Sequence, residues 1–219
     1  MKVQTKICGL TRVEEALACA QAGADAIGLV FYPPSPRHVS VQQAKSICLA
    51  LPSSVATVGV FVDPPGEEIL LLAKRLELSM VQLHGNETPE TVRMLQRAGL
   101  KVIKALRSSG DLLLEEALQY ADADALLVEA SRGVLPGGNG ASWDWALARP
   151  LADKRSFILA GGLNAENVVE AIRLSGASAV DLSSGAESSP GSKDLDKVHK
   201  IIQQVRSCAP GKEQGAVFS

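Results

Sequence analysis

Short apolar runs alternate with amphipathic stretches along the whole chain, and this alternation is its main structural signal. The apolar runs are almost continuously hydrophobic, which is typical of strands buried on both faces. We expect strands at Val3–Cys8, Ala26–Val30, Ala56–Val62, Met80–Leu83, Lys101–Leu106, Ala125–Val128, Ser156–Ala160 and Ala179–Leu182. The stretches between them predict helices at Val13–Ala22, Val41–Leu51, Glu67–Leu76, Thr88–Ala98, Leu112–Tyr120, Trp143–Ala148, Ala165–Ser175 and Leu195–Ser207.

Eight strand–helix units in a chain of 219 residues predict one α/β domain, a single (β/α)8 TIM barrel with eight parallel strands. A doubly wound sheet also alternates strands and helices, and it is the main competing fold. The first strand–helix turn, Cys8-Gly9-Leu10-Thr11, lacks the dinucleotide-binding fingerprint, which favours the barrel. We expect the barrel to span residues 1–207 and residues 208–219 to form a disordered C-terminal tail.

Composition limits the classes of partner. The net charge is −2 with scattered basic residues, so we expect no nucleic-acid partner. No apolar run approaches the roughly 20 residues of a membrane span, and no signal peptide is evident, which predicts a cytoplasmic protein. The four cysteines form no CxxC pair and the three histidines are far apart, so we expect no metal site. We expect a monomer, with a homodimer as the alternative.

Cys8 is the first candidate for chemistry, because it stands where the first strand ends. Thr11 and Glu14 have the spacing of a capping box that opens the following helix. In a parallel barrel the strand ends that carry such loops form the catalytic face. From its position alone, the Cys8 thiol is either a proton-transfer group or a nucleophile.

Two turns rich in small residues predict a phosphate site. Gly161 and Gly162 follow the seventh strand, and Ser183, Ser184 and Gly185 follow the eighth. Glycines let backbone N–H groups approach a ligand closely, and the loops after strands seven and eight bind phosphate in many barrels. The competing interpretation is that both are only tight turns.

Other polar residues fall at the same predicted face. Arg37 lies in a proline-rich loop after strand two, where its guanidinium suits a carboxylate or phosphate, although many surface arginines are simply solvated. His84 ends strand four and Asp181 lies within strand eight; both could line the site or serve as structural hydrogen-bonding groups. Gly138 and Asn139 belong to a glycine-rich loop after strand six that is either a lid over the ligand or a plain connector.

Several motifs together resemble the phosphoribosylanthranilate isomerases of tryptophan biosynthesis, nearly from end to end. They are Lys6-Ile7-Cys8-Gly9-Leu10-Thr11-Arg12, Gly28-Leu29-Val30-Phe31 with Ser35-Pro36-Arg37, Val58-Gly59-Val60-Phe61-Val62, Gln82-Leu83-His84-Gly85, Gly137-Gly138-Asn139-Gly140 with Asp144-Trp145, Leu159-Ala160-Gly161-Gly162-Leu163, and Val180-Asp181-Leu182-Ser183-Ser184-Gly185 with Lys193-Asp194. The opening motif and the Ser-Ser-Gly turn are the most specific of these.

The resemblance implies an Amadori rearrangement of a phosphorylated aminoaldose to an aminoketose, an aldose–ketose isomerisation without cofactor or metal. It implies that Cys8 is the general base and that the general acid follows strand six. It also implies that Arg37 holds the anthranilate carboxylate, while the turns after strands seven and eight hold the phosphate.

Glu129 is a departure from this pattern, because the family has aspartate at the position of the acid. The carboxyl group is kept on an arm one methylene longer, so either Glu129 is the acid or the role has moved. The histidine-pathway isomerase, a related barrel, fits less well because Cys8 stands at its first aspartate position. A metal-dependent epimerase barrel would need histidine and aspartate ligands at strand ends that this chain lacks. A phosphate-binding barrel without turnover is the alternative outside enzymes.

Overall fold

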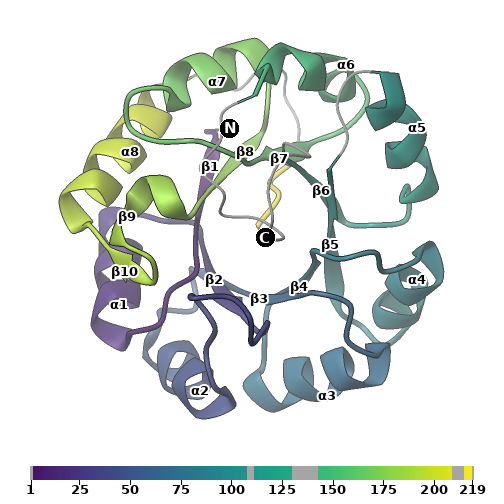
Figure 1. The fold of residues 1–219 in the computed structure, drawn as a ribbon, viewed down its shortest axis with the longest axis vertical. Helices are drawn as coiled ribbons and strands as arrows, with labels where there is room; N and C mark the ends of the chain where they lie inside the picture. The colour runs from purple at the N-terminus through teal and green to yellow at the C-terminus, as the bar shows by residue number, and fades with distance from the viewer. Residues whose placement is uncertain (1, 108–110, 130–142, 209–214, 219) are drawn as a thin grey trace.

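The eight predicted strands close into one parallel barrel. The computed structural model describes residues 2–107, 111–129, 143–208 and 215–218. Neighbouring strands pair in chain order, and β1 closes the ring against β8 (Figure 1). The strands are β1 (Gln4–Cys8), β2 (Ala26–Val30), β3 (Ala56–Phe61), β4 (Met80–Leu83), β5 (Lys101–Leu106), β6 (Ala125–Val128), β7 (Phe157–Leu159) and β8 (Ala179–Leu182). The predicted TIM barrel is therefore confirmed.

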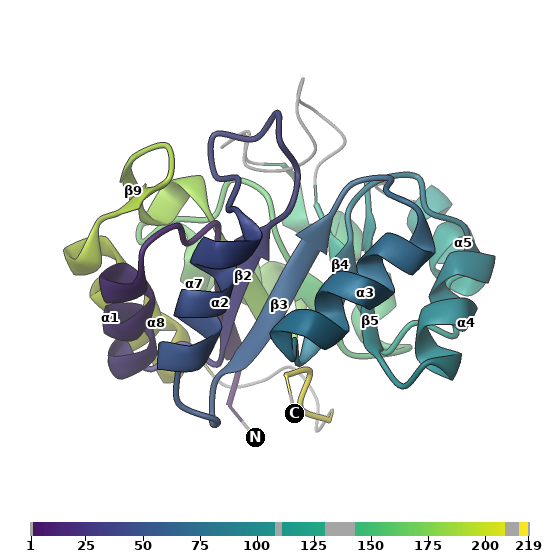
Figure 2. The same cartoon turned by 90° about the horizontal axis from the view of Figure 1, so that it is seen from below.

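Helices surround the barrel on its outside (Figures 1 and 2). They are α1 (Val13–Ala22), α2 (Val41–Ala50), α3 (Gly66–Leu76), α4 (Pro89–Arg97), α5 (Asp111–Gln119), the 3-10 helix η1 (Trp145–Ala148), α6 (Arg149–Ala152), α7 (Val168–Ser175), the 3-10 helix η2 (Ser184–Ala186) and α8 (Leu195–Ser207). A short hairpin of β9 (Glu187–Ser189) and β10 (Ser192–Lys193), which the hydrophobic pattern did not predict, precedes α8. None of the helices in the described ranges is long and apolar enough to cross a membrane.

The side chains of each strand alternate between the outside and the inside of the barrel, as the pleat requires. One large apolar cluster fills the layer between strands and helices, with Ile7, Val81 and Leu126 among its members. A second cluster, which includes Ala26, Met80 and Ile158, fills the interior. Cys8, His84 and Glu129 follow the inward-facing alternation, so they lie at the carboxyl ends of the strands above that interior cluster.

The predicted capping box at the start of α1 is wrong. Arg12 is the N-cap residue of α1, and no side chain caps the helix there. The Thr11 hydroxyl instead donates to the carbonyl of Gly191, 2.9 Å away in the turn between β9 and β10. Thr11 thus ties the β1–α1 loop to a hairpin distant in sequence, and this long-range contact outweighs the local cap.

Within the predicted C-terminal tail, Val217 and Phe218 pack against the barrel. Val217 and Phe218 are buried with the interior cluster, and their backbone N–H groups donate to Gln4 Oε1 over 2.6 and 3.1 Å. Because Gln4 begins β1, these residues lie at the amino end of the barrel, opposite the predicted catalytic face. The yellow segment beside the C label lies inside the ring in Figure 1 and below the barrel in Figure 2. Composition did not reveal this contact, because only two apolar residues close the barrel there.

Candidate active site

Cys8 ends β1 as a buried thiol beside β2. Its partner across the strands is Gly28, and a Cβ atom added to Gly28 would lie 2.6 Å from Cys8 Sγ. Glycine at this position therefore provides the room that the thiol occupies. Burial raises the pKa of Cys8, whereas the charges of Lys6 and Lys193 oppose that rise. The thiolate depends on these two ammonium groups.

Lys6 places a fully buried charge inside the barrel, two residues before Cys8 on the same face of β1. Its Nζ lies 2.9 Å from Asp181 Oδ2, on β8. Burial works against the charge on Lys6, but the attraction of Asp181 and of Cys8 outweighs it and raises the pKa of Lys6. The ammonium is thus held in its charged form next to the thiol.

Glu129 follows β6 and is buried, with 6% exposure against 8% for Cys8. Its Oε1 lies 2.8 Å from His84 Nε2 and 3.5 Å from Arg107 Nε. Burial alone would raise the pKa of Glu129, but His84, Arg107 and Lys6 together lower it. The charge of Lys6 thus favours the ionised form of both Cys8 and Glu129.

Arg37 is buried and held by Glu187 of the β9–β10 hairpin. Arg37 Nε and Nη2 donate to the two oxygens of Glu187 over 2.8 and 2.7 Å. Lys193 Nζ donates to Glu187 Oε1 over 2.8 Å, which places two cations on one carboxylate. Burial lowers the pKa of Lys193 despite Glu187, whereas the hydrogen bonds that Arg37 donates to Glu187 raise the pKa of Arg37. The hairpin therefore fixes a cationic group beside Cys8.

The two predicted phosphate turns lie against each other. Gly161 and Gly162 have φ angles of +87° and +67°, a conformation that favours glycine. A Cβ at Gly185 would lie 1.9 Å from the carbonyl oxygen of Leu163, so the turn after β8 packs directly on the loop after β7. Ser183 Oγ is buried and has no hydrogen-bond partner among the described residues. The two turns are therefore in contact, and the turn after β8 carries a buried hydroxyl without a described partner.

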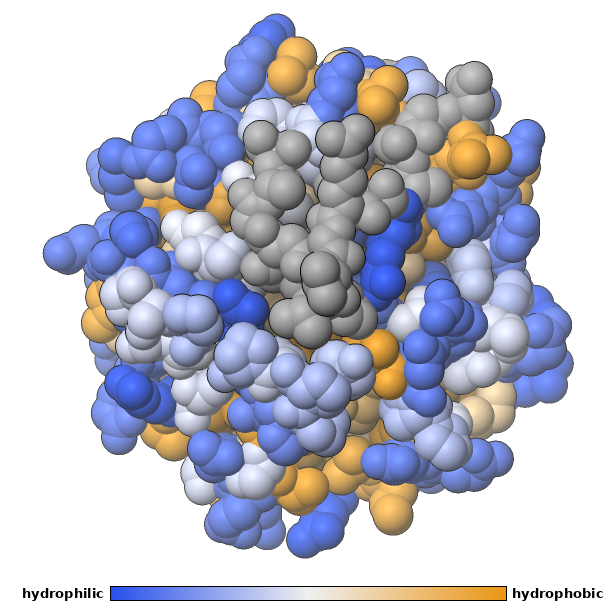
Figure 3. Space-filling view, viewed as in Figure 1, coloured by the Kyte–Doolittle hydropathy of each residue, from blue (hydrophilic) through white to orange (hydrophobic). Residues whose placement is uncertain are grey.

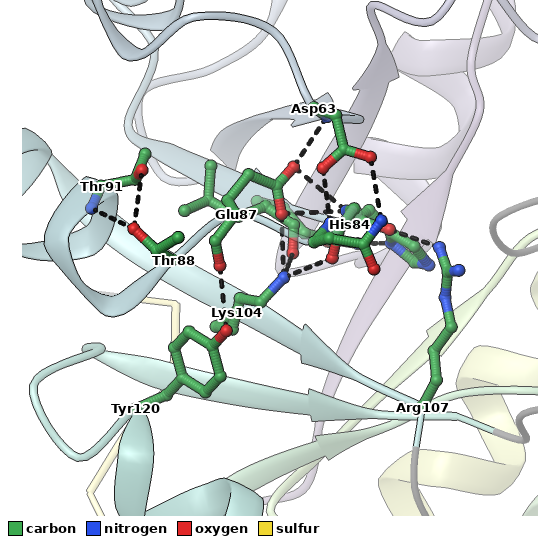
Figure 4. A network of polar contacts seen from close by, with 12 residues as sticks. Asp63, His84, Glu87, Thr88, Thr91, Lys104, Arg107 and Tyr120 are labelled. Atoms are coloured by element: carbon green, nitrogen blue, oxygen red, sulfur yellow. Dashed lines mark hydrogen bonds and ion pairs between the residues drawn. The ribbon is translucent and has the colours of Figure 1, made fainter.

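A buried polar network supports the loop after β4 from the outer side of the barrel (Figure 4). Glu87 Oε2 lies 2.8 Å from Lys104 Nζ, and Glu87 Oε1 accepts hydrogen bonds from the backbone N–H groups of Asp63 and Gly85. Lys104 Nζ also donates to the carbonyl of Gly85 over 2.7 Å. This network fixes the chain directly after His84.

The structure brings together the described residues that the sequence predicted for the site, at the carboxyl ends of the strands. They are Cys8, Arg37, His84, Glu129, Gly161, Gly162, Asp181, Ser183, Ser184 and Gly185. Gly138 and Asn139 lie outside the described residues, so their part in the site stays a prediction. The roles assigned to the individual residues also stay predictions.

Sequence reasoning missed five polar residues around the site: Lys6, Gln82, Glu187, Lys193 and Lys104. For the first two a signal existed, since Lys6 and Gln82 stand two residues before Cys8 and His84 and so share their inward face. Glu187 and Lys193 gave no such signal, because the hairpin that carries them has little hydrophobic alternation. Lys104 faces outward, where its buried ammonium pairs with Glu87 and donates to the carbonyl of Gly85.

Known proteins of one family match this chain along nearly its whole length. A family model described as N-(5'-phosphoribosyl)anthranilate (PRA) isomerase matches residues 5–204. A protein of that name from Desulfatibacillum aliphaticivorans is 46% identical over 219 residues, covering 100% of both chains. One from Rubrobacter xylanophilus is 45% identical, covering 93% of this chain and 99% of the relative.

Solved structures give the same result. Phosphoribosyl anthranilate isomerase from Thermotoga maritima superposes with a TM-score of 0.88 at 40% identity, over 94% of this chain and 100% of that one. A second structure, described as the isomerase in complex with reduced 1-(o-carboxyphenylamino)-1-deoxyribulose 5-phosphate, has a TM-score of 0.85 at 40% identity, with the same coverage. The chain belongs to the N-(5'-phosphoribosyl)anthranilate isomerase family.

Proposed function

We propose that this chain catalyses the isomerase reaction of its family in tryptophan biosynthesis. The reaction converts N-(5-phosphoribosyl)anthranilate to 1-(2-carboxyphenylamino)-1-deoxyribulose 5-phosphate by general acid and base catalysis. The observation that carries the proposal is the pair of Cys8 and Glu129, at the ends of β1 and β6, around the charge of Lys6. A phosphorylated sugar with an aromatic carboxylate matches the cationic and small-residue parts of the same face.

Glu129 is the proposed acid of the first step. Its carboxyl proton passes to the furanose ring oxygen, the C1–O bond breaks, and the nitrogen lone pair forms an iminium at C1. Glu129 is buried, so a proton on it can be directed at the substrate rather than lost to solvent. The extra methylene relative to aspartate carries the carboxyl group to within 2.8 Å of His84.

Cys8 is the proposed base of the second step. Its thiolate takes the proton from C2, and the C–H electrons form the C1–C2 double bond while the iminium nitrogen recovers its lone pair. The resulting enolamine tautomerises to the ketone. Since the iminium accepts the electrons, the substrate itself supplies the electron sink. Lys6 favours the thiolate against the effect of burial, and so keeps the base available.

Arg37 is proposed to hold the substrate carboxylate while remaining paired with Glu187. An arginine has five N–H donors, and Glu187 uses two of them, on Nε and Nη2. The remaining N–H groups, on Nη1 and Nη2, can donate to a further carboxylate. Glu187 then fixes the orientation of the guanidinium before substrate arrives.

The turns after β7 and β8 are proposed to hold the phosphate. The positive φ angles of Gly161 and Gly162 let the backbone approach an anion without a Cβ in the way. Ser183 Oγ supplies a buried hydroxyl that has no partner elsewhere in the described part of the chain. Ser184 and Gly185 continue this surface in η2.

The direct test is turnover. Substrate is formed in situ from anthranilate and phosphoribosyl pyrophosphate, and the loss of its anthranilate fluorescence is followed after the protein is added. The proposal expects decay that is proportional to protein concentration. Decay no faster than the spontaneous rate at micromolar protein contradicts it, and would favour a phosphate-binding barrel without turnover.

We also propose that the protein functions in the cytoplasm and that it is a monomer. The large hydrophobic residues exposed in the described ranges are spread over several helices, with Leu49 on α2, Leu118 on α5 and Leu195 on α8. The face in Figure 3 is correspondingly mostly hydrophilic, with scattered hydrophobic residues. A Thermotoga maritima isomerase is described as dimeric, so the homodimer remains the alternative that sedimentation distinguishes.

A further inference from the structure

Three buried side chains form a hydrogen-bonded chain that ends at the proposed acid. Gln82 Nε2 lies 2.7 Å from His84 Nδ1, and His84 Nε2 lies 2.8 Å from Glu129 Oε1. Gln82, His84 and Glu129 are 1%, 7% and 6% exposed, so solvent has little access to the protons that they share. Gln82 and His84 come from consecutive inward positions at the end of β4, and Glu129 from the end of β6.

We propose that His84 is a positioning residue that stores the proton which Glu129 delivers to the substrate. The inference rests on the proposed function, because it assigns to His84 the supply of the acid in that reaction. His84 has no contact with the reacting atoms in this account. It acts only through Glu129.

The need for a proton store follows from the charges around Glu129. A glutamate with an ordinary pKa of about 4.3 is protonated in only about 0.2% of molecules at pH 7. Arg107 Nε, 3.5 Å from the carboxylate, and the buried Lys6 both favour the ionised form. An imidazole titrates near pH 6.5, so a hydrogen-bonded imidazole–carboxyl pair keeps one proton to a higher pH than the carboxyl group alone.

The amide of Gln82 supplies the means to accept that proton. In the orientation observed, the amide N–H donates to Nδ1, so the proton of neutral His84 is on Nε2 and is donated to Glu129. Gln82 Oε1 is buried and has no hydrogen-bond partner among the residues that the structure describes. A half-turn of the amide places this oxygen on Nδ1, where it accepts the second proton of an imidazolium. The Nε2 proton then passes to Glu129, and His84 remains neutral with its proton on Nδ1.

The backbone around His84 is held firmly enough for this transfer. Arg107 Nη2 donates to the carbonyl of His84, and the Glu87–Lys104 pair fixes the adjoining Gly85 (Figure 4). Arg107 therefore contacts both His84, through its carbonyl, and Glu129, through its carboxylate. The donor and acceptor of the proposed transfer are thus held at fixed separation from two sides.

The test is the pH profile of kcat in His84→Gln and His84→Asn. The glutamine side chain can still place an N–H near Glu129, but its amide cannot take up an additional proton. The asparagine side chain is too short to reach Glu129. We expect one limb of the wild-type profile in the imidazole range, and we expect it to move toward the carboxyl range in both variants. The kcat at pH 7.5 should fall by about 10²-fold, the ratio of the two ordinary proton affinities.

Binding of reduced 1-(o-carboxyphenylamino)-1-deoxyribulose 5-phosphate, measured by calorimetry, should change by less than about threefold, because His84 does not touch the ligand in this account. His199→Asn, on the exposed face of α8, is the matched control and should keep the wild-type profile. Equal loss of kcat at every pH with an unmoved limb would mean a purely structural role and overturn the proposal.

Two further measurements separate the possible failures. A wild-type protein without turnover contradicts the proposed function itself, whereas a fully active Glu129→Gln variant removes Glu129 as the acid and the role of His84 with it. If neither His84 variant folds, Gln82→Leu decides, because it removes the amide that would accept the second proton on Nδ1. We expect the same movement of the limb in this variant, and a wild-type profile overturns the proposal.

Discussion

At the scale of single residues, neighbouring cations favour the ionised forms of the acidic groups in the site. Cys8 is driven toward the neutral thiol by burial and toward the thiolate by Lys6 and Lys193. Lys6 can remain charged inside the barrel because Asp181 pairs with it. The common location of Cys8, Arg37 and the glycine turns could be predicted from the sequence, because the ends of parallel strands converge on one face of a barrel. The partners of these residues could not, since pairs such as Arg37 with Glu187 join positions 150 residues apart.

Arg37→Ala should weaken substrate binding more than it slows the chemical step. The substitution removes the proposed partner of the substrate carboxylate, so we expect KM to rise by about tenfold or more, as for the loss of a charge-assisted hydrogen bond, with a smaller change in kcat. Steady-state kinetics by anthranilate fluorescence measure both. Arg173→Ala, at an exposed position on α7, is the control and should leave KM unchanged. A wild-type KM in Arg37→Ala would remove this arginine from the carboxylate site.

At the scale of elements, alternation along the strands explains both what was predicted and what was missed. Near-continuous apolar runs located all eight strands to within one residue of their observed ends. The same runs concealed the inward-facing Lys6 and Gln82, because a single polar residue hardly changes the hydrophobicity of a strand. The β9–β10 hairpin was missed because its strands have three and two residues and no apolar face.

Lys104 links β5 to the loop after β4, and Lys104→Met should destabilise the protein by about 3–5 kcal/mol. The substitution leaves the Glu87 carboxylate buried at 6% exposure without its 2.8 Å partner. Urea unfolding followed by circular dichroism gives the free energy of unfolding. Lys45→Met, at an exposed position of α2, should change it by no more than about 0.5 kcal/mol. Equal stabilities of the two variants would show that the pair does not support the loop.

At the scale of the whole molecule, the two ends of the barrel differ in kind. The carboxyl ends of the strands carry charged and small residues, whereas the amino ends are closed by Val217 and Phe218 on the interior cluster. Two hydrogen bonds to Gln4 fix this closing segment to β1. The sequence predicted the barrel and the face that carries the chemistry, but a pair of apolar residues after a polar stretch gave no sign of long-range packing.

Phe218→Ala should lower the free energy of unfolding by about 2 kcal/mol while leaving kcat unchanged. Phe218 is 7% exposed, so the variant loses most of the burial of an aromatic side chain, yet it lies at the end of the barrel opposite Cys8. Thermal or urea unfolding tests the first part and the fluorescence assay the second. Leu71→Ala, at an exposed position on α3, is the control and should be nearly neutral. Wild-type stability in Phe218→Ala would mean that the segment does not close the barrel in solution.

The most direct test of the account compares kcat for Cys8→Ala, Glu129→Gln and the double variant by loss of anthranilate fluorescence. If the thiol and the carboxyl group serve one substrate, each single change should lower kcat by about 10²–10⁴-fold. The double variant should then be no slower than the slower single variant, as for groups that act as a unit. Wild-type kcat in either single variant would contradict a shared acid–base site. So would a double variant whose fold-loss of kcat equals the product of the two single losses.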